Sequence, residues 1–167
     1  MSRRMLTLFI VCFCTLLLTE SPQSKEKGEM TSAKPSARTH AVAKVIVHSS
    51  DAKPYDQTVS PSLMEIYISE TFSGDIDGES TVRALQVQGK DKSARQVSMQ
   101  RFSGKLGGRQ GTFVLQGQED VENGKIKATW LVVPGSGTGD LSGLRGEGGF
   151  EGGFGKGSDG WLDYWFE

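Results

Sequence analysis

The sequence predicts an all-β fold: a single eight-stranded antiparallel β-barrel in which successive strands are neighbours. Three observations lead to this expectation. From residue 40 onwards apolar and polar residues alternate with a period of two, which is typical of strands with one buried face. All of the 22 glycines except Gly28 follow Ser73, and repeated glycine in a strand-rich chain marks turns, bulges and barrel corners. Short turn signals separate the alternating segments, so hairpins are expected to join the strands.

The first four predicted strands each carry apolar residues two positions apart and are separated by polar segments. Residues 51–56 are expected to form a turn or an irregular loop. The Asp77-Gly78 dipeptide predicts a hairpin turn at residues 75–78, and residues 89–92 are expected to turn the chain again. These strands are expected at residues 40–49, 63–73, 80–87 and 96–106.

The last four predicted strands follow equally clear turn signals. Gly107-Gly108 and Asn123-Gly124 are two-residue hairpin turns, and the glycine-rich segment 135–143 is expected to be a wide turn with bulges. The strands are expected at residues 111–118, 125–133, 145–154 and 160–166. Eight strands can close into a barrel that side chains fill or that holds one small ligand.

The N-terminal region is expected to direct export. Arg3 and Arg4 precede a mostly apolar run from Met5 to Leu18, which is too short to span a bilayer comfortably. We therefore expect a signal peptide at residues 1–21, a flexible linker at 22–39 and the barrel domain at 40–167. The expected location is secreted or periplasmic, without stable membrane insertion once the signal is removed. An uncleaved membrane anchor, or a cytoplasmic protein that starts at Met30, are the alternatives.

Composition excludes several kinds of chemistry. The net charge is −1, from 19 Lys and Arg against 20 Asp and Glu, and without a basic stripe no nucleic-acid partner is expected. Cys12 and Cys14 both lie in the predicted signal peptide, so the barrel is expected to lack disulfides and thiolate chemistry. His40 and His48 are too few for a zinc site. We therefore expect neither a metal nor a cofactor.

Polar residues inside the predicted strands are candidates for a ligand site, because small-molecule pockets are mostly apolar with a few convergent polar groups. The candidates are Tyr67, Arg101, Gln116 and Trp130 in the interior, with Glu65 or Glu147 as a polar anchor. The leading hypothesis is a non-enzymatic protein that binds a small, mostly apolar molecule. It fails if Arg101 and Gln116 both point at solvent. The oligomeric state stays open.

Several segments, taken in order, resemble one known family. They are residues 53–56, 72–75, 107–116, 130–141, 143–150 and 162–167. From about residue 41 to the end, the chain is similar to domain-of-unknown-function family 3224, whose fold is like the allene oxide cyclase barrel and is lipocalin-like. The resemblance implies the eight-stranded barrel and brings no function with it. Relatives often carry His where this chain has Gly117, so a site built on that His is missing here.

Two other functions are alternatives. By analogy with allene oxide cyclase, the protein is a cofactor-free cyclase or isomerase that uses a buried carboxylate, such as Glu65 or Glu147, whose pKa desolvation would raise. In the other alternative the barrel is filled and its outer surface carries an interaction function. A solid core with an exposed apolar patch would favour this last hypothesis.

Overall fold

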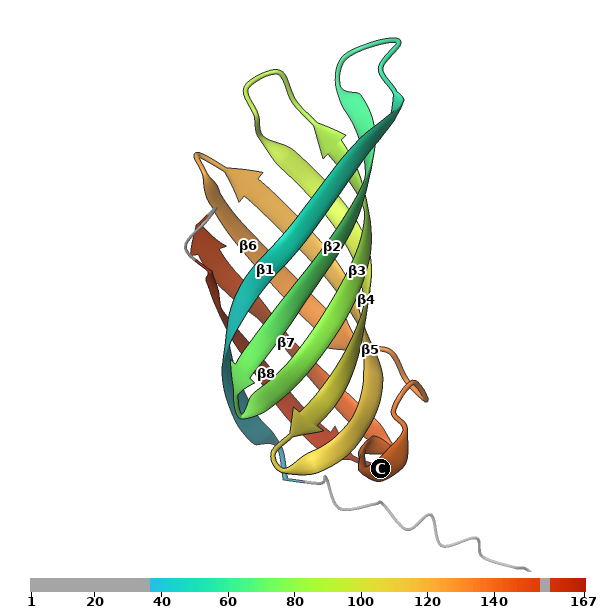
Figure 1. Cartoon of the computed structure of the whole chain (residues 1–167), viewed down its shortest axis with the longest axis vertical. Coiled ribbons are helices and arrows are strands. Elements are labelled where there is room, and N and C mark those ends of the chain that lie inside the picture. Colours follow the sequence, from blue (N-terminus) through green and yellow to red (C-terminus); the bar gives the residue numbers. More distant parts are fainter. Residues whose placement is uncertain (1–36, 154–156) are drawn as a thin grey trace, which may run out of the picture. The chain divides into compact units, whose positions relative to one another are not determined.

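The computed structural model describes residues 37–153 and 157–167, which contain a closed antiparallel barrel of eight strands in chain order (Figure 1). The predicted all-β meander barrel is thereby confirmed. The predicted signal peptide and residues 22–36 of the predicted linker lie outside the described residues. The strands are β1 (Thr39–Asp56), β2 (Ser62–Gly74), β3 (Ile76–Gln88), β4 (Ala94–Leu106), β5 (Arg109–Glu122), β6 (Lys125–Val132), β7 (Leu144–Gly153) and β8 (Ser158–Phe166).

The strands differ in length, and this gives the barrel two unlike ends. β1 has 18 residues and β5 has 14, whereas β6 has 8 and β8 has 9. Within the described ranges, β1 pairs with β8 only as far as Val45, while its pairing with β2 continues to Asp56. In Figure 1 the turns that join β1 to β2 and β3 to β4 rise beyond the turn that joins β5 to β6. We call this the open end; it carries the turns at residues 57–61, 89–93 and 123–124.

The loop expected at residues 51–56 is wrong, because β1 continues through it. Ser50 to Pro54 pair residue by residue with Ile68 to Met64 of β2. A bulge at His48, between Val47 and Ser49, shifts the register and lets β1 continue beyond it. The segment was predicted as a loop from its polar residues and Pro54, yet a strand with a partner on one side tolerates both.

The turn expected at residues 75–78 is displaced. It lies one step earlier, at Gly74 and Asp75, where the Asp75 amide donates to the Val42 carbonyl at 2.9 Å. Gly78 lies inside β3, opposite Gly104 of β4. Both glycines have positive φ, 155° and 157°, and a Cβ on either would collide with the facing backbone. Glycine is needed here for the close approach of two strands and not for a turn.

The other hairpin turns form as predicted. Asn123 and Gly124 have φ values of 52° and 74°, and Gly107 and Gly108 have 57° and 82°. Two successive positive φ values are the geometry of the type I′ turns that match the twist of a hairpin. The glycine-rich segment between β6 and β7 is a wide turn that contains the short 3₁₀ helix η1 (Gly139–Leu141).

Aromatic and aliphatic side chains fill the end of the barrel opposite the open end, which we call the closed end. Phe102 packs edge-on against Phe72, with ring centroids 5.6 Å apart, and lies 4.8 Å from Phe113. Leu141 of η1 is fully buried among them. Contacts of this kind add to the free energy gained from burying apolar surface.

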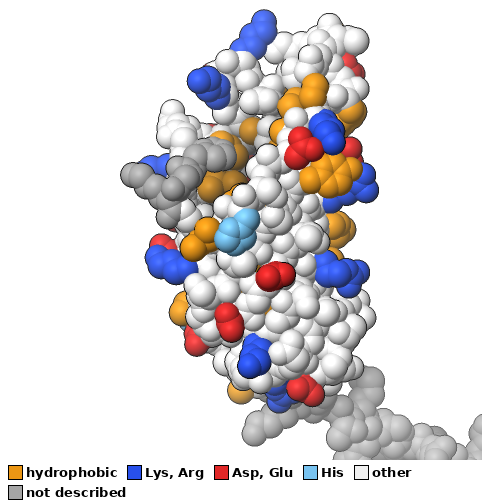
Figure 2. Space-filling view, viewed as in Figure 1, with side chains coloured by type: hydrophobic (Ala, Val, Ile, Leu, Met, Phe, Trp, Pro, Cys, Tyr) orange, Lys and Arg blue, Asp and Glu red, His pale blue; other side chains and the backbone are white. Residues whose placement is uncertain are grey.

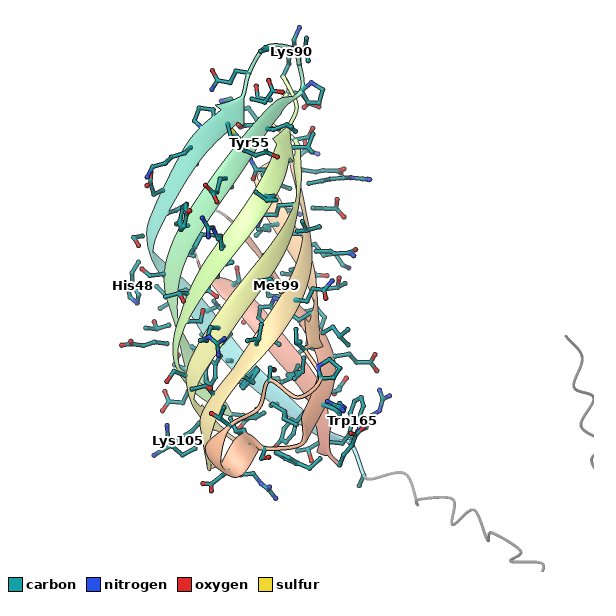
Figure 3. The ribbon with its side chains drawn as sticks, turned by 90° about the vertical axis from the view of Figure 1, so that its right-hand side faces the viewer. His48, Tyr55, Lys90, Met99, Lys105 and Trp165 are labelled. Carbon is teal, nitrogen blue, oxygen red and sulfur yellow. The ribbon has the colours of Figure 1, made fainter. Side chains whose placement is uncertain are left out.

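The outer surface carries charges of both signs. Lys and Arg side chains lie among Asp and Glu side chains on the face shown in Figure 2, without a field of one sign. His48 and Trp165 project away from the barrel wall (Figure 3). Of the helices among residues 37–153 and 157–167, none has the length and apolar character that crossing a bilayer requires.

Candidate functional site

Glu65 and Tyr67, which were both predicted to line the interior, lie together on the outer face of the barrel. Glu65 accepts a hydrogen bond from Arg83 Nε at 2.9 Å, and Tyr67 contacts the same guanidinium, which lies 4.9 Å from its ring centroid. Tyr67 is 37% exposed. The inward positions of β2 are the intervening ones, Ile66 and Glu70 among them.

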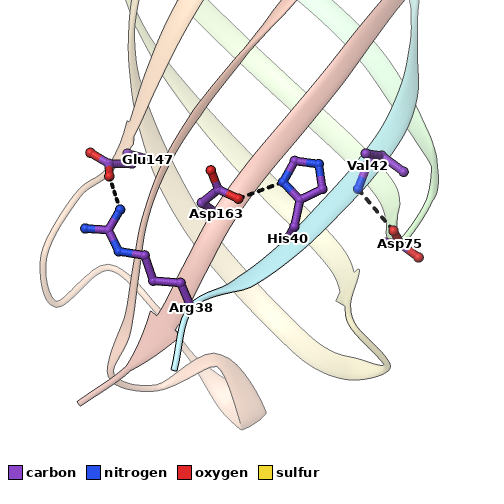
Figure 4. A network of polar contacts seen from close by, with 6 residues as sticks. All are labelled: Arg38, His40, Val42, Asp75, Glu147 and Asp163. Atoms are coloured by element: carbon purple, nitrogen blue, oxygen red, sulfur yellow. Dashed lines mark hydrogen bonds and ion pairs between the residues drawn. The ribbon is translucent and has the colours of Figure 1, made fainter. Parts of the chain in front are cut away.

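Three further candidates also face outwards. Arg101 and Gln116 are exposed on β4 and β5. Glu147 pairs with Arg38 on the outside of the barrel (Figure 4). In the same region His40 Nδ1 lies 2.6 Å from Asp163 Oδ1. The predicted interior placement of Arg101 and Gln116 is therefore wrong, and the ligand hypothesis built on these two residues fails by the test stated for it. Glu65 and Glu147 also face outwards and are not interior anchors.

Only Trp130 of the six candidates lies inside the barrel. Its ring packs 5.2 Å from that of Phe150 and 5.9 Å from that of Phe72, measured between centroids. Gly160 makes room for it, since a Cβ there would lie 3.3 Å from the indole. Trp130 thus separates the packed core at the closed end from the space beyond it.

That space is a cavity of about 370 Å³ in the open half of the barrel. Its apolar wall comes from Val45, Ile68, Val82, Ile126 and Phe150. Its polar lining comes from Glu70, Gln96, Gln100 and Glu119, together with Ser50 and Ser158. The barrel is therefore filled at one end and hollow at the other, and the volume is near the lower limit of small-molecule pockets.

Glu70 extends from β2 into this cavity. Its Oε1 accepts hydrogen bonds from Ser80 Oγ, at 3.0 Å, and from the side-chain amide of Gln100. Burial raises the pKa of Glu70 to about 7, and repulsion from Glu119 adds to the rise, while the two hydrogen bonds oppose it. Both protonation states of Glu70 are therefore populated near neutral pH.

Glu119 extends into the same cavity from β5. Its side chain is buried, with 4% of the residue exposed, and its Oε1 accepts a hydrogen bond from Ser98 Oγ at 2.6 Å. Burial raises the pKa of Glu119, although Ser98 and Gln96 act in the opposite direction. Within the described part of the chain, Glu119 Oε2 is one of two buried side-chain polar atoms without a hydrogen-bond partner.

Gly117 provides the room for this arrangement. It lies opposite Ser98 in the β4–β5 register and faces inwards. A Cβ at this position would collide with both Ser98 Oγ and Glu119 Oε1. The absence of a side chain at Gly117 thus allows Ser98 to reach Glu119 diagonally across the two strands.

Among the described residues, the lining has acidic groups without basic ones. In the part of the chain that the structure describes, no Lys, Arg or His lines the cavity, and neither Glu70 nor Glu119 takes part in an ion pair. A metal is a poor fit, because no group of three or more His, Cys, Asp or Glu among these residues could hold one. The site can accept hydrogen bonds and protons, and it can hold a positive charge.

The sequence contained one signal that would have found these residues. Gln96, Gln100 and Glu119 occupy alternate positions whose other members, such as Phe102 and Val121, are apolar and buried. Polar residues at the inward phase of a strand are the ones that line a barrel. The phase was ambiguous because the opposite face of β3 and β4 also carries apolar residues, among them Leu85 and Val97.

The comparisons with known proteins agree with the fold. The family model for a protein of unknown function, DUF3224, matches residues 41–167. The crystal structure of a DUF3224-family protein of unknown function from Shewanella oneidensis MR-1 is similar, with a TM-score of 0.64 and 28% identity; the match covers 78% of this chain and 98% of that one. No curated protein matches the sequence significantly. With three quarters of its length matched by the family model, this chain belongs to the DUF3224 family.

Proposed function

We propose that this protein binds a small, mostly apolar molecule in the cavity at the open end of the barrel. The observation that carries the proposal is a space of about 370 Å³ whose wall is mostly apolar and carries a few polar side chains. Such a lining favours a ligand with an apolar body and one polar end. The hypothesis built on Arg101 and Gln116 has failed, so this proposal rests on different residues, those that line the cavity, and shares only the kind of ligand with it.

Binding is better supported than catalysis. Glu70 has a pKa of about 7, which suits the acid–base step of an isomerase or cyclase. Such a reaction also needs a group that stabilises the negative charge developing on the substrate. The described lining offers only neutral donors, such as Gln96 and Gln100, and no Lys, Arg or His, and a second carboxylate, Glu119, would oppose that charge. A completely filled barrel is also inconsistent with the cavity.

Filling the cavity tests the proposal. Val82 is inward-facing, 8% exposed and part of the cavity wall, whereas Leu85 on the same strand is outward-facing and 50% exposed. We expect the protein to bind the neutral probe 2-phenylethanol in isothermal titration. The Val82→Phe variant should lose most of this affinity, and the matched Leu85→Phe variant should keep it.

Mass spectrometry of the protein purified from its producing cells complements the titration. Under native conditions we expect extra mass that disappears on denaturation, in the original protein and in Leu85→Phe but not in Val82→Phe. Probe binding that Val82→Phe leaves intact would contradict a site in the cavity. Circular dichroism establishes that each variant has kept the barrel.

A further inference from the structure

We propose that the cavity selects ligands whose polar end is a protonated nitrogen, such as an alkylammonium group, held by the carboxylates of Glu70 and Glu119. This inference rests on the proposed binding function and adds the chemical class of the ligand. It follows from the charges in the cavity, from one buried oxygen and from the shape of the lining.

The first observation is a concentration of negative charge. Glu70 on β2 and Glu119 on β5 both line the cavity, and they lie close enough for the charge of Glu119 to raise the pKa of Glu70. Every ion pair between described residues lies elsewhere, on the outer surface of the barrel. Two carboxylates in a partly dehydrated space attract a cation strongly, because the low dielectric strengthens their field.

The second observation is an acceptor without a donor. Glu119 Oε2 is buried, in a residue that is only 4% exposed, and accepts no hydrogen bond from any described residue. Gln96 lies close enough to lower the pKa of Glu119, but it makes no hydrogen bond to this oxygen. Leaving such an oxygen unpaired is unfavourable. An ammonium group supplies N–H donors and a positive charge together, and so satisfies this oxygen in both respects.

The third observation is that the donors beside Glu70 are already used. Glu70 Oε1 accepts from Ser80 and Gln100, and Gln100 Nε2 also donates to Ser80 Oγ at 2.7 Å. These contacts fix the Glu70 carboxylate against the wall. A ligand with a carboxylate of its own would meet two like charges and no basic side chain in the described lining. The lining therefore discriminates against fatty-acid-like anions by repulsion.

The apolar wall of the cavity determines which kind of body the ligand has beyond its charged nitrogen. Val45, Val82 and Ile126 lie around the polar group, and Phe150 meets Trp130 at the boundary with the packed core. An amine with a short aliphatic or aromatic body would place its nitrogen between the carboxylates and its carbon atoms against these residues. A small aromatic amine is the simplest compound of this kind.

Three probes of one shape test the inference by titration with the full chain at pH 8. They are 2-phenylethylamine, which is a cation, 2-phenylethanol, which is neutral, and 3-phenylpropanoate, which is an anion. We expect the amine to bind more tightly than the alcohol, by on the order of tenfold or more, and the anion not to bind measurably. Glu119→Gln and Glu70→Gln should each remove most of this preference while leaving the affinity for the alcohol nearly unchanged.

The matched control is Glu65→Gln, which alters a carboxylate of β2 on the outer face and should leave all three affinities unchanged. If the alcohol or the anion binds as tightly as the amine, in a manner sensitive to Val82→Phe, the ligand class is wrong and the binding function stands. If Glu65→Gln weakens the amine as much as Glu119→Gln does, the amine is held at the surface and the inference is overturned. If none of the three probes binds, the binding function itself fails.

Discussion

Glu70 holds a carboxyl group in the barrel interior at the expense of folding stability. Its pKa rises from 4.5 to about 7 on folding, chiefly because burial disfavours the charged form. A shift of that size means that folding is less favourable by ~3 kcal/mol when Glu70 is ionised than when it is protonated. Ser80 from β3 and Gln100 from β4 are neutral donors to this group, and Glu119 from β5 is the titratable group that acts on it. An unfavourable charge that the neighbouring residues accommodate is typical of a binding or reaction site.

We expect Glu70→Gln to stabilise the protein at pH 8 and to flatten the pH dependence of its stability. Between pH 4.5 and about 7 the folded state binds more protons than the unfolded state at Glu70. The free energy of unfolding therefore falls as pH rises through this window, by up to ~3 kcal/mol. Urea unfolding at pH 5 and pH 8 measures the effect. Glu65→Gln is the control, and a Glu70→Gln variant whose stability falls with pH as steeply as the original would contradict the assignment.

Which alternate residues of a strand face the interior decides which residues form a site. A single sequence determines this orientation only where the two faces of the strand differ in polarity. In β5 and β6 the inward positions include Phe113 and Trp130, but Leu131 is exposed on the outside. Arg101 and Gln116 were assigned to the interior because they interrupt apolar strands. In the barrel these two residues face outwards and are solvated by water. Glu70 faces inwards, where Ser80 and Gln100 donate hydrogen bonds to its carboxylate.

At the scale of the elements, the alternation and the turn dipeptides predicted eight strands and their order. They failed where a residue type has two structural uses. Asp77-Gly78 fits a hairpin turn, yet Gly78 meets Gly104 across β3 and β4. Pro54 fits a loop, yet it lies in the part of β1 that pairs on one side only among the described residues. Both outcomes depend on neighbours that are distant in the sequence, which local patterns do not contain.

We expect Gly104→Ala to destabilise the protein far more than Gly108→Ala. Both glycines have positive φ, so alanine is strained at either position by about 1 kcal/mol or more. A Cβ on Gly104 would also collide with the Asp77 carbonyl and the Gly78 Cα of β3, whereas one on Gly108 would meet nothing within 4 Å. Relieving the collision requires β3 and β4 to separate beside Phe102.

Urea unfolding of the two variants measures the difference, which we expect to be at least ~2 kcal/mol, a typical value for forced overpacking. If Gly104→Ala does not fold, its failure beside a folded Gly108→Ala is the same result in a stronger form. Equal losses of stability in the two variants would show that φ alone matters and that the strands do not need their close approach.

The molecule as a whole combines two halves with different demands. The closed end has fully buried Phe102, Leu106 and Leu144 and supplies most of the apolar burial that stabilises the fold. The open end contains a cavity and two carboxylates, which reduce stability. The stable half thus supports a less stable half that has room for a ligand, as is common where function requires an imperfectly packed site.

Hydrogen exchange should reveal this division. We expect the amides of residues 46–56 in β1 to exchange on the order of 100-fold faster than those of residues 99–106 in β4, because local opening free energies extend from near zero up to the global value. The first segment pairs with β2 alone among described strands and has exposed side chains throughout. The second pairs with β3 and β5 and contains the fully buried Phe102 and Leu106. Mass spectrometry of peptides from both segments gives the two rates in one experiment. Equal protection would mean that the barrel opens only as one cooperative unit, and that local opening at the cavity end costs as much free energy as opening of the core.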